Sequence, residues 1–430
     1  MSPLGFGGTY DVVVVGGGPG GLGAAVSAAR NGATTLLIER EGFLGGMMTT
    51  GLPLNTFHDA HGNQVIRGVA NEMLERLRKI GGAGEHMDVR ETEPRLPKTT
   101  TPVDTESVKR VALEMIDEAG AELLLYTFTV DVLLEDSAVK GVVVENKSGR
   151  QVILAEVVID ATGDGDVAAR AGAAYEKGRE EDGRMQPPSL MFRLEGVDLE
   201  KAKATTPEQL QKLAAEAHAR GELPESVNTG WRIINPKGDV ALNFTRVLDI
   251  DGTSAKDLTR AEIEARKQLV MGVEFLQKYV PGYESAYVVE SGPLMGIRET
   301  RRIMGEYVLT KEDVLHEREF DDAIARSSYL VDIHNPSGPD VTLISLDHGG
   351  SHGIPYRCLV PRGIENLLVA GRCISATHEA HAAIRVMVTC MAVGQAAGTA
   401  AALSCTQKVP VRDVDVPKLR QTLIGQDCIV

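Results

Sequence analysis

The pattern of hydrophobic and polar positions changes abruptly after Val12–Val15, where four valines lead into a glycine-rich segment. A short continuous apolar run before glycine is typical of a buried strand. The segment LGAAVSAARNG that follows predicts a helix ending at Gly32, and TTLLIER predicts a second strand ending in Glu39. The chain therefore begins with a predicted βαβ unit, from about Tyr10 to Arg40.

The glycines of this turn follow the G-x-G-x-x-G spacing at Gly16, Gly18 and Gly21. The first permits a tight turn, the second lets a pyrophosphate approach the backbone, and the third lets helix and strand pack closely. Phosphates would then lie at the positive end of the helix. The predicted cofactor-binding residues of the turn are Gly16, Gly18, Pro19, Gly20 and Gly21.

Glu39 lies eighteen residues after Gly21, close to the spacing of a carboxylate that accepts hydrogen bonds from ribose hydroxyls. Further along, AELLLYTFTVDVLLED, AVKGVVVENKSG and QVILAEVVIDATGDGD predict three strands with turns between them. A β-meander that ends in Ala-Thr-Gly and a second glycine turn favours FAD over NAD, since an NAD-binding domain usually continues with regular βα units.

The remaining pattern predicts an α/β fold with a Rossmann-like FAD-binding domain and β-meander, interrupted by an α+β substrate domain. Asp104 is expected to cap the helix TESVKRVALEMIDEAG, and NLLVAGR is expected to return to the first sheet before a long helix rich in Ala and Gly. The predicted FAD-binding parts are residues 1–178, with a loop and helix insertion at 52–100, and residues 353–430. The predicted substrate domain is residues 179–352.

Composition narrows the class of function. The net charge of −15 argues against binding to nucleic acid or to an anionic membrane. No apolar run approaches the roughly 20 residues of a membrane span, and the first residues lack a signal-like pattern, so we expect a cytoplasmic protein. The five cysteines have no C-x-x-C spacing and the histidine pairs complete no known pattern, so no metal site is predicted.

Several stretches resemble a known family: DVVVVGGGPGGLGAAVSAARNG, LLIEREGFLGGMMTTG, VVIDATGDGDVAARAGA, GIRETRRIMGEYVLT and IPYRCLVP through GQAAGTAAA. Together they resemble bacterial FAD-dependent oxidoreductases of the glutathione-reductase-like superfamily, in which the FAD-bearing component of heterodisulfide reductase is a distant relative. The resemblance implies that FAD is the cofactor, that the glycine turn holds its pyrophosphate and that Glu39 binds the adenosine ribose.

The resemblance also implies further contacts to FAD. Those expected along the phosphates and ribityl chain are Arg40, Gly45, Gly46 and Met47. Val130 is expected against the adenine, and Ala161, Thr162 and Gly163 over the cofactor. Gly371 and Arg372 occupy the strand end where most relatives carry Gly-Asp, so Arg372 could pair with the pyrophosphate. Ala383 and Ile384 are expected at the start of the last helix, with backbone N–H groups toward the flavin N1–C2 edge.

Absent motifs separate the reactions of this superfamily. The segment EGFLGGMMTTG has no redox cysteine pair, clustered cysteines for an iron–sulfur centre are missing, and no second glycine fingerprint indicates a nicotinamide domain. The favoured reaction is transfer of a hydride from a small organic substrate to flavin N5, with reoxidation by oxygen or another acceptor. Two alternatives stay open: a flavin monooxygenase reduced transiently by NAD(P)H, and an FAD-bearing electron-transfer subunit that needs a partner.

Candidate catalytic residues lie in the segments expected to face the flavin. They are His378 and His381 for proton transfer, Tyr356 and Arg357 from the preceding strand, and Arg298, with Arg301 and Arg302, as a clamp for a substrate carboxylate. A packing or ion-pair role is the alternative for each. Asn243 and Arg246 are weaker candidates, as is a covalent flavin bond to His58 or His61.

Overall fold

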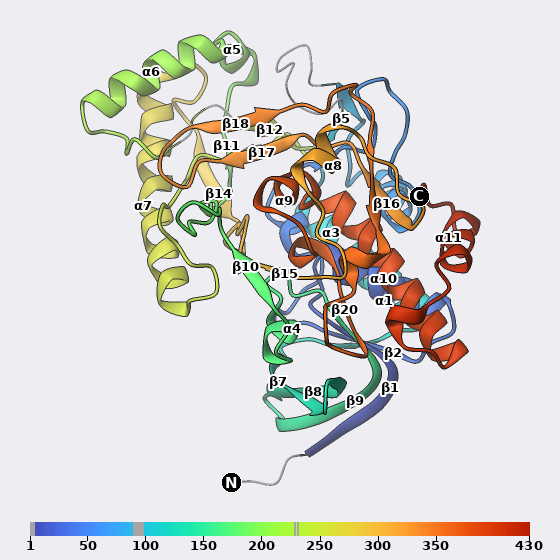
Figure 1. The fold of residues 1–430 in the computed structure, drawn as a ribbon. Helices are drawn as coiled ribbons and strands as arrows, with labels where there is room; N and C mark the ends of the chain where they lie inside the picture. Colours follow the sequence, from blue (N-terminus) through green and yellow to red (C-terminus); the bar gives the residue numbers. More distant parts are fainter. Residues whose placement is uncertain (1–4, 89–98, 228, 230–231) are drawn as a thin grey trace.

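The computed structural model describes residues 5–88, 99–227, 229 and 232–430 of the 430-residue chain (Figure 1). Its first part contains β1 Gly5–Val15, α1 Pro19–Arg30, β2 Thr35–Ile38, β3 Leu54–Asn55, α2 Val69–Lys79, β4 Met87–Asp88, β5 Thr99–Thr101, α3 Thr105–Ala119, β6 Glu122–Leu124, β7 Phe128–Glu135, β8 Ala138–Asn146, β9 Gly149–Asp160 and α4 Asp166–Arg170. The side chain of Asp104 caps α3 by accepting a hydrogen bond from the Ser107 N–H, as predicted.

The central sheet joins both ends of the chain. β1 pairs in parallel with β2 and with β9, β2 pairs with β6, and β20 (Leu367–Val369) adds in parallel beside β9. The four valines at the end of β1 are buried, which explains their continuous apolar run: a parallel strand is covered on both faces. β7, β8 and β9 form the antiparallel meander. The predicted Rossmann-like fold with a β-meander is confirmed.

The middle of the chain builds a smaller sheet with its own hydrophobic core. The elements of this part of the chain are β10 Tyr175–Lys177, β11 Phe192–Glu195, α5 Leu199–Lys203, α6 Pro207–Ala219, β12 Arg232–Ile234, β13 Val240–Leu242, α7 Ala255–Tyr279 and β14 Tyr287–Ser291. Of these, β10 lies outside the smaller sheet and pairs with β15 (Arg301–Ile303). The sheet order is β12-β13-β11-β14, and α7 packs through Leu269 and Leu276 into the same core as Phe192 and Phe244. This second core draws on residues 190–286.

Residues beyond this core return to the first one. They form β15 Arg301–Ile303, α8 Lys311–Leu315, β16 Ala323–Ser327, β17 Val331–His334, β18 Val341–Ile344, β19 His352–Pro355, β20, α9 His378–Ile384, α10 Met387–Gln407 and α11 Val416–Gly425. Ile303, Ile324, Val331 and Ile354 are buried in the same cluster as the β1 valines. The 179–352 boundaries stay a prediction, and the separate core within them is shorter.

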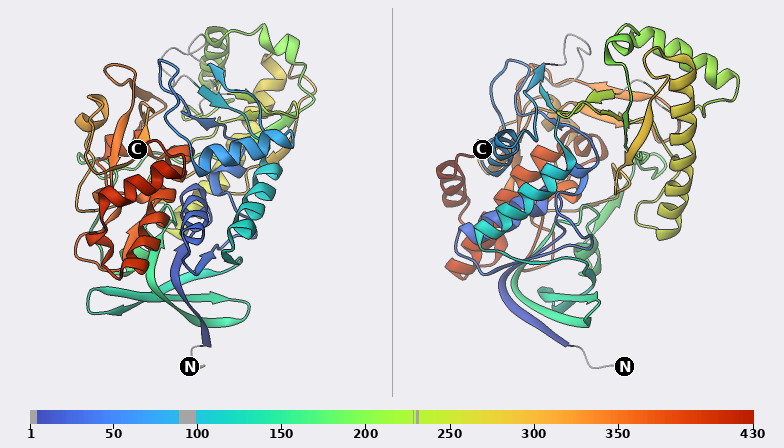
Figure 2. Two further views of the ribbon diagram at one scale, coloured as in Figure 1. Left: turned by 90° about the vertical axis from the view of Figure 1, so that its right-hand side faces the viewer. Right: turned by 180° about the vertical axis from the view of Figure 1, so that it is seen from behind.

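The helices α1 and α10, far apart in the sequence, lie side by side over the central sheet (Figures 1 and 2). Their backbones touch at two glycines of α10. A Cβ atom built on Gly394 would lie 2.0 Å from the carbonyl oxygen of Gly20, and one on Gly398 would lie 2.1 Å from that of Ala24. The Ala- and Gly-rich composition of α10 is therefore a consequence of close helix packing.

The expectation that no segment has the length and apolarity of a membrane span is wrong for α10. This 21-residue helix contains a stretch with a mean hydropathy of 1.3, but 83% of that stretch is buried inside the structure. Its apolarity is thus accounted for by the core that surrounds it on nearly every side.

We predict that Gly394→Ala lowers the free energy of unfolding by about 1–3 kcal/mol, because the added methyl group forces α10 away from α1. The measurement is urea unfolding followed by circular dichroism. Gly425→Ala is the matched control, since a Cβ there meets no atom within 4 Å, and it should stay within about 1 kcal/mol of wild type. Equal midpoints for the two variants would contradict the close helix contact.

Candidate functional site

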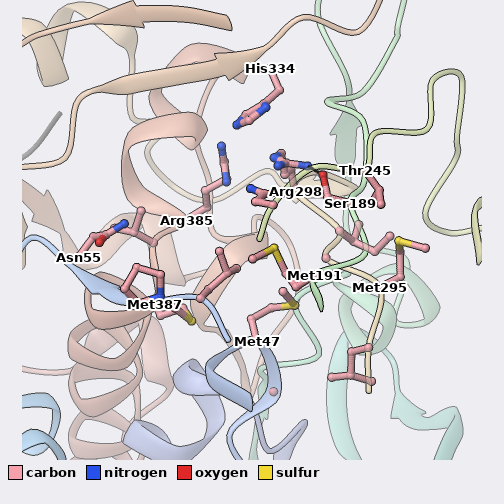
Figure 3. Close-up of a pocket in the computed structure, with 18 of the residues that line it drawn as sticks. Met47, Asn55, Ser189, Met191, Thr245, Met295, Arg298, His334, Arg385 and Met387 are labelled. Atoms are coloured by element: carbon pink, nitrogen blue, oxygen red, sulfur yellow. Dashed lines mark hydrogen bonds between the residues drawn. The ribbon is translucent and has the colours of Figure 1, made fainter. Parts of the chain in front are cut away.

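A cavity of about 1550 Å³ runs from the glycine turn after β1 to the sheet of the middle unit. Drug-sized ligands occupy pockets of about 300–1,000 Å³, so this volume has room for a dinucleotide and a second small molecule. Figure 3 shows the part where the two units meet, with Met47 from the first unit near Met191 and Met295.

The glycine turn forms one end of the cavity. Gly16, Gly18, Pro19 and Gly20 line it, and a Cβ atom added to Gly18 would meet no protein atom within 4 Å. The space beside Gly18 is therefore open to a ligand. Gly21 faces the other way: a Cβ atom there would lie 1.6 Å from the carbonyl oxygen of Gly16, so only glycine lets α1 follow β1 so closely.

Glu39 stands at the cavity wall immediately after β2. Its Oε2 accepts a hydrogen bond from the Gly17 N–H at 2.5 Å, and its Oε1 accepts one from the Glu41 N–H at 2.9 Å. The carboxylate thus fixes the glycine turn against the second strand. It also places negative charge where ribose hydroxyl groups would donate.

The segment after β9 forms the next part of the wall. Ala161, Thr162 and Gly163 line the cavity as predicted, and so does Asp164, which was not predicted. Arg372 donates from Nη2 to Asp164 Oδ1 at 2.6 Å and from Nη1 to the Thr300 hydroxyl at 3.0 Å. Arg372 therefore enters the cavity already paired with a carboxylate. The acidic run Asp-Gly-Asp directly after Ala-Thr-Gly was the available signal for Asp164.

Other predicted cofactor residues divide by position. Those that line the cavity are Arg40, Gly46, Met47, Gly371 and Arg372. Gly45 supports the wall through its N–H bond to the Gly17 carbonyl. Val130 lies outside the lining, and residues 127–129 line the cavity in its place. The Val130 carbonyl accepts a hydrogen bond from Arg170 Nε.

The placement of Ala383 and Ile384 at a helix start is wrong. They lie at the end of α9, which Thr377 caps and which ends at Ile384. The long helix α10 begins only at Met387, after a break at Arg385 and Val386, and these three residues line the cavity. Any backbone N–H groups offered to a flavin by the α10 N-terminus therefore come from the residues at and after Met387.

Of the five main catalytic candidates, only Arg298 lines the cavity, and the other four lie outside it. His378 Nδ1 lies 2.9 Å from Glu299 Oε1, and His381 is fully buried away from the cavity lining. Tyr356 is buried and donates its hydroxyl proton to the Val411 carbonyl at 2.6 Å. Arg357 pairs with Asp322. Their expected place at the cavity was wrong: the break before α10 leaves His378 and His381 on a separate short helix, and Tyr356 and Arg357 are held by Val411 and Asp322 in the turn after β19.

Other candidates are placed as follows. Arg301 pairs with Asp166, and buried Arg302 pairs with Glu299, so neither takes part in the predicted clamp. His58 and His61 do not line the cavity. In the described part of the chain no three His, Cys, Asp or Glu side chains gather as metal ligands.

Arg298 lines the cavity, and Figure 3 shows it near His334 and Arg385. Arg246 and Asp332 line the same cavity and act electrostatically on Arg298. Burial, and then Arg385 and Arg246, lower the pKa of Arg298 to about 9. Burial lowers the pKa of His334 to about 3, so this histidine is neutral. Burial raises the pKa of Asp332, but His334 and then the guanidinium groups of Arg385 and Arg298 outweigh burial and hold that pKa below its ordinary value.

Sequence reasoning missed Arg385, Asp332 and His334 entirely. They come from the α9–α10 break and from β17, while Arg246 and Arg298 come from the loops after β13 and β14. No local spacing links such distant segments. The available signal for Arg385 was its place directly before the long helix.

The strand ends, the glycine turn and the acidic residue after β2 define a dinucleotide-binding α/β protein. A profile of the FAD dependent oxidoreductase family matches residues 11–423, nearly the whole chain. The chain therefore belongs to the FAD-dependent oxidoreductase family. It is an enzyme of the oxidoreductase class, and FAD is its cofactor.

Similar proteins support the same family. The chain is 35% identical over 189 residues to a thiamine thiazole synthase of Aeropyrum pernix, covering 41% of this chain and 62% of that enzyme. It is 27% identical over 157 residues to a digeranylgeranylglycerophospholipid reductase of Thermoplasma volcanium, covering 36% of this chain and 39% of that one. The match thus spans less than two thirds of either relative.

Solved structures share the fold at low identity. The flavin-dependent brominase Bmp2 has a TM-score of 0.51 at 14% identity, with 97% of this chain and 83% of that one covered. The p-nitrophenol 4-monooxygenase of Pseudomonas putida has a TM-score of 0.51 at 12% identity, with 97% and 86% covered. This likeness extends over both units of the chain.

We predict that Gly18→Ala folds normally but binds FAD more weakly, because the added methyl group takes the space through which a pyrophosphate would approach the backbone. Gly18 has φ −73° and ψ −170°, which alanine adopts, and its Cβ would project into empty space beside the turn. Equilibrium dialysis should show at least about a tenfold weaker affinity for FAD, with apoprotein stability within about 1 kcal/mol of wild type. Unchanged FAD affinity would show that the cofactor does not approach this turn. Gly425→Ala, outside the cavity, is the control.

Proposed function

We propose that this enzyme oxidises a small organic substrate by two electrons. FAD held at the glycine turn would supply a hydride acceptor at flavin N5: one substrate C–H bond would break to give the hydride, and a proton on the neighbouring atom of the substrate would leave to a basic group or to solvent. Oxygen or another acceptor would then take the two electrons and reoxidise the cofactor. The observation that carries the proposal is one continuous cavity, which joins the FAD-binding turn to the polar groups of the middle unit.

The residues of the chain supply binding and orientation. Ser189, Asn243 and Thr245 line the cavity on the side of the middle unit. Asn243 Oδ1 is buried and has no hydrogen-bond partner among the described residues, so it is free to accept one from a substrate. Met47 and Met387 form an apolar wall that excludes water near the glycine turn.

We also propose that the chain is related to the glutathione-reductase-like superfamily, with the FAD-bearing component of heterodisulfide reductase as a distant relative. The lack of a redox cysteine pair separates the chain from disulfide reductases in function. The described structure is consistent with that separation, since the five cysteines are free and Cys358, Cys373 and Cys390 are buried. Burial raises the pKa of Cys390, the cysteine that lines the cavity, to about 12, which disfavours its reactive thiolate.

We predict that the visible absorption of the FAD-loaded protein bleaches under anaerobic conditions when an organic donor is added. NADH and NADPH should leave the flavin oxidised over the same time. Each donor is also mixed with free FAD, so that bleaching in the absence of protein is subtracted. The donors are alcohols, amines and acids with an oxidisable C–H bond.

Rapid bleaching by NADH or NADPH would favour the monooxygenase alternative instead. A flavin that no donor and no nicotinamide reduces would favour the electron-transfer role. Either result contradicts the proposed oxidation of an organic substrate.

A further inference from the structure

We propose that the substrate carries an oxyanion, a carboxylate or a phosphate, bound by Arg298 and Arg385 where the cavity reaches the middle unit. Arg246 is a positioning residue that adds positive charge behind them. This inference rests on the proposed function, because it names the substrate class of the same cavity.

Positive charge exceeds negative charge at this end of the cavity. Three guanidinium groups, those of Arg246, Arg298 and Arg385, meet one buried carboxylate, that of Asp332. Asp332 is shared, since Oδ2 accepts from the Tyr329 hydroxyl at 3.0 Å and lies 3.5 Å from Arg385 Nη2. Buried charges are costly unless they are paired, so a ligand anion would complete the balance.

His334 and Asp340 do not remove this surplus. His334 Nδ1 lies 2.9 Å from Arg246 Nη2 and so accepts a hydrogen bond from the guanidinium, which leaves the ring neutral. Asp340 attracts Arg246, but the residue is exposed and meets that guanidinium through its backbone carbonyl. The remaining positive charge points into the cavity.

Two of the three arginines keep donors for a ligand. Arg298 uses Nη1 to donate to the Pro187 carbonyl at 2.6 Å and to the Ser189 hydroxyl at 2.8 Å. Both hydrogen bonds that Arg298 donates within the described chain come from Nη1, so its Nε and Nη2 are left without a protein acceptor there. The buried Nε of Arg385 likewise has none there. Charge-assisted bonds from such donors are the usual way that proteins hold carboxylates and phosphates.

Arg246 has no such freedom. Its Nη1 contacts the backbone carbonyls of residues 338–340, and its Nη2 contacts His334. It is buried, and its positive charge acts on Arg298, which has free donors. This arrangement separates a binding pair from a positioning residue.

Figure 3 places the proposed anion site and the apolar wall at different levels of the cavity. His334, Arg385 and Arg298 gather in the upper part of the view, while Met387 and Met47 lie below them toward α10 and the glycine turn. A substrate anchored by its oxyanion would extend its apolar portion toward the methionines. The oxidisable carbon would then lie on the side of the FAD-binding turn.

Calorimetric titration of the FAD-loaded protein tests this directly and does not require turnover. The probes are phenylacetate and butyrate, their uncharged amides phenylacetamide and butyramide, and phenyl phosphate, all at one low ionic strength. The acids should bind at least about tenfold more tightly than their amides, because the charge-assisted bonds are lost with the amides. The phosphate probe tells which oxyanion is preferred.

Arg298→Gln should weaken binding of the preferred probe at least about tenfold, and Arg298→Lys should restore part of it. Arg326→Gln is the control: Arg326 is half-buried like a site arginine but is paired with Glu319 and lies outside the cavity. Thermal unfolding and flavin content confirm that each variant is folded. The comparison of acid with amide on the wild-type protein stands even if an Arg298 variant fails to fold.

Equal binding of acids and amides, or an intact affinity in folded Arg298→Gln, would overturn the inference. Its failure is distinguishable from failure of the proposed function. If acids bind but no donor reduces the flavin, the anion site stands and the oxidation does not. If an uncharged donor reduces the flavin and no oxyanion binds, the oxidation stands and the anion site is refuted.

Discussion

The backbone contact between α1 and α10 determines where both halves of the site lie. Gly20, at the start of α1, touches Gly394 of α10, and the same α1 turn lines the cavity. Because helices in such contact cannot shift without a clash, the N-terminus of α10 is fixed relative to the glycine turn. Arg385 and Met387, just before and at that N-terminus, are thereby held at the far wall of the same cavity.

Electrostatics impose the second constraint. The FAD-binding end carries Glu39 and the Asp164–Arg372 pair, in which charges are matched inside the protein. The end formed with the middle unit carries more guanidinium groups than carboxylates. A cavity that carries the Glu39 carboxylate, unpaired with any cation of the described chain, at one end and surplus guanidinium groups at the other suits the two proposed ligands: a cofactor held largely by backbone, and a smaller anionic molecule held by arginine side chains.

The parts predicted from sequence are those encoded by local spacing. The valine run, the glycine turn, Glu39 and the Ala-Thr-Gly strand end lie within short segments whose periods are set by strand and helix geometry. The arginine cluster was not predictable in this way, since Arg246, Asp332 and Arg385 meet only through tertiary packing. His378 and His381 were misplaced because the break between α9 and α10 was missed, although Thr377 provides a capping signal for a separate short helix.

We propose above all that one cavity holds FAD and an organic substrate side by side. The most direct measurement is a crystal structure of the FAD-loaded protein soaked with the tightest-binding oxyanion. We expect flavin density with its pyrophosphate at Gly18, its ring system beside Met47 and Met387, and the oxyanion on Arg298. A flavin ring that itself fills the space at Arg298, or lies outside this cavity, would contradict the account.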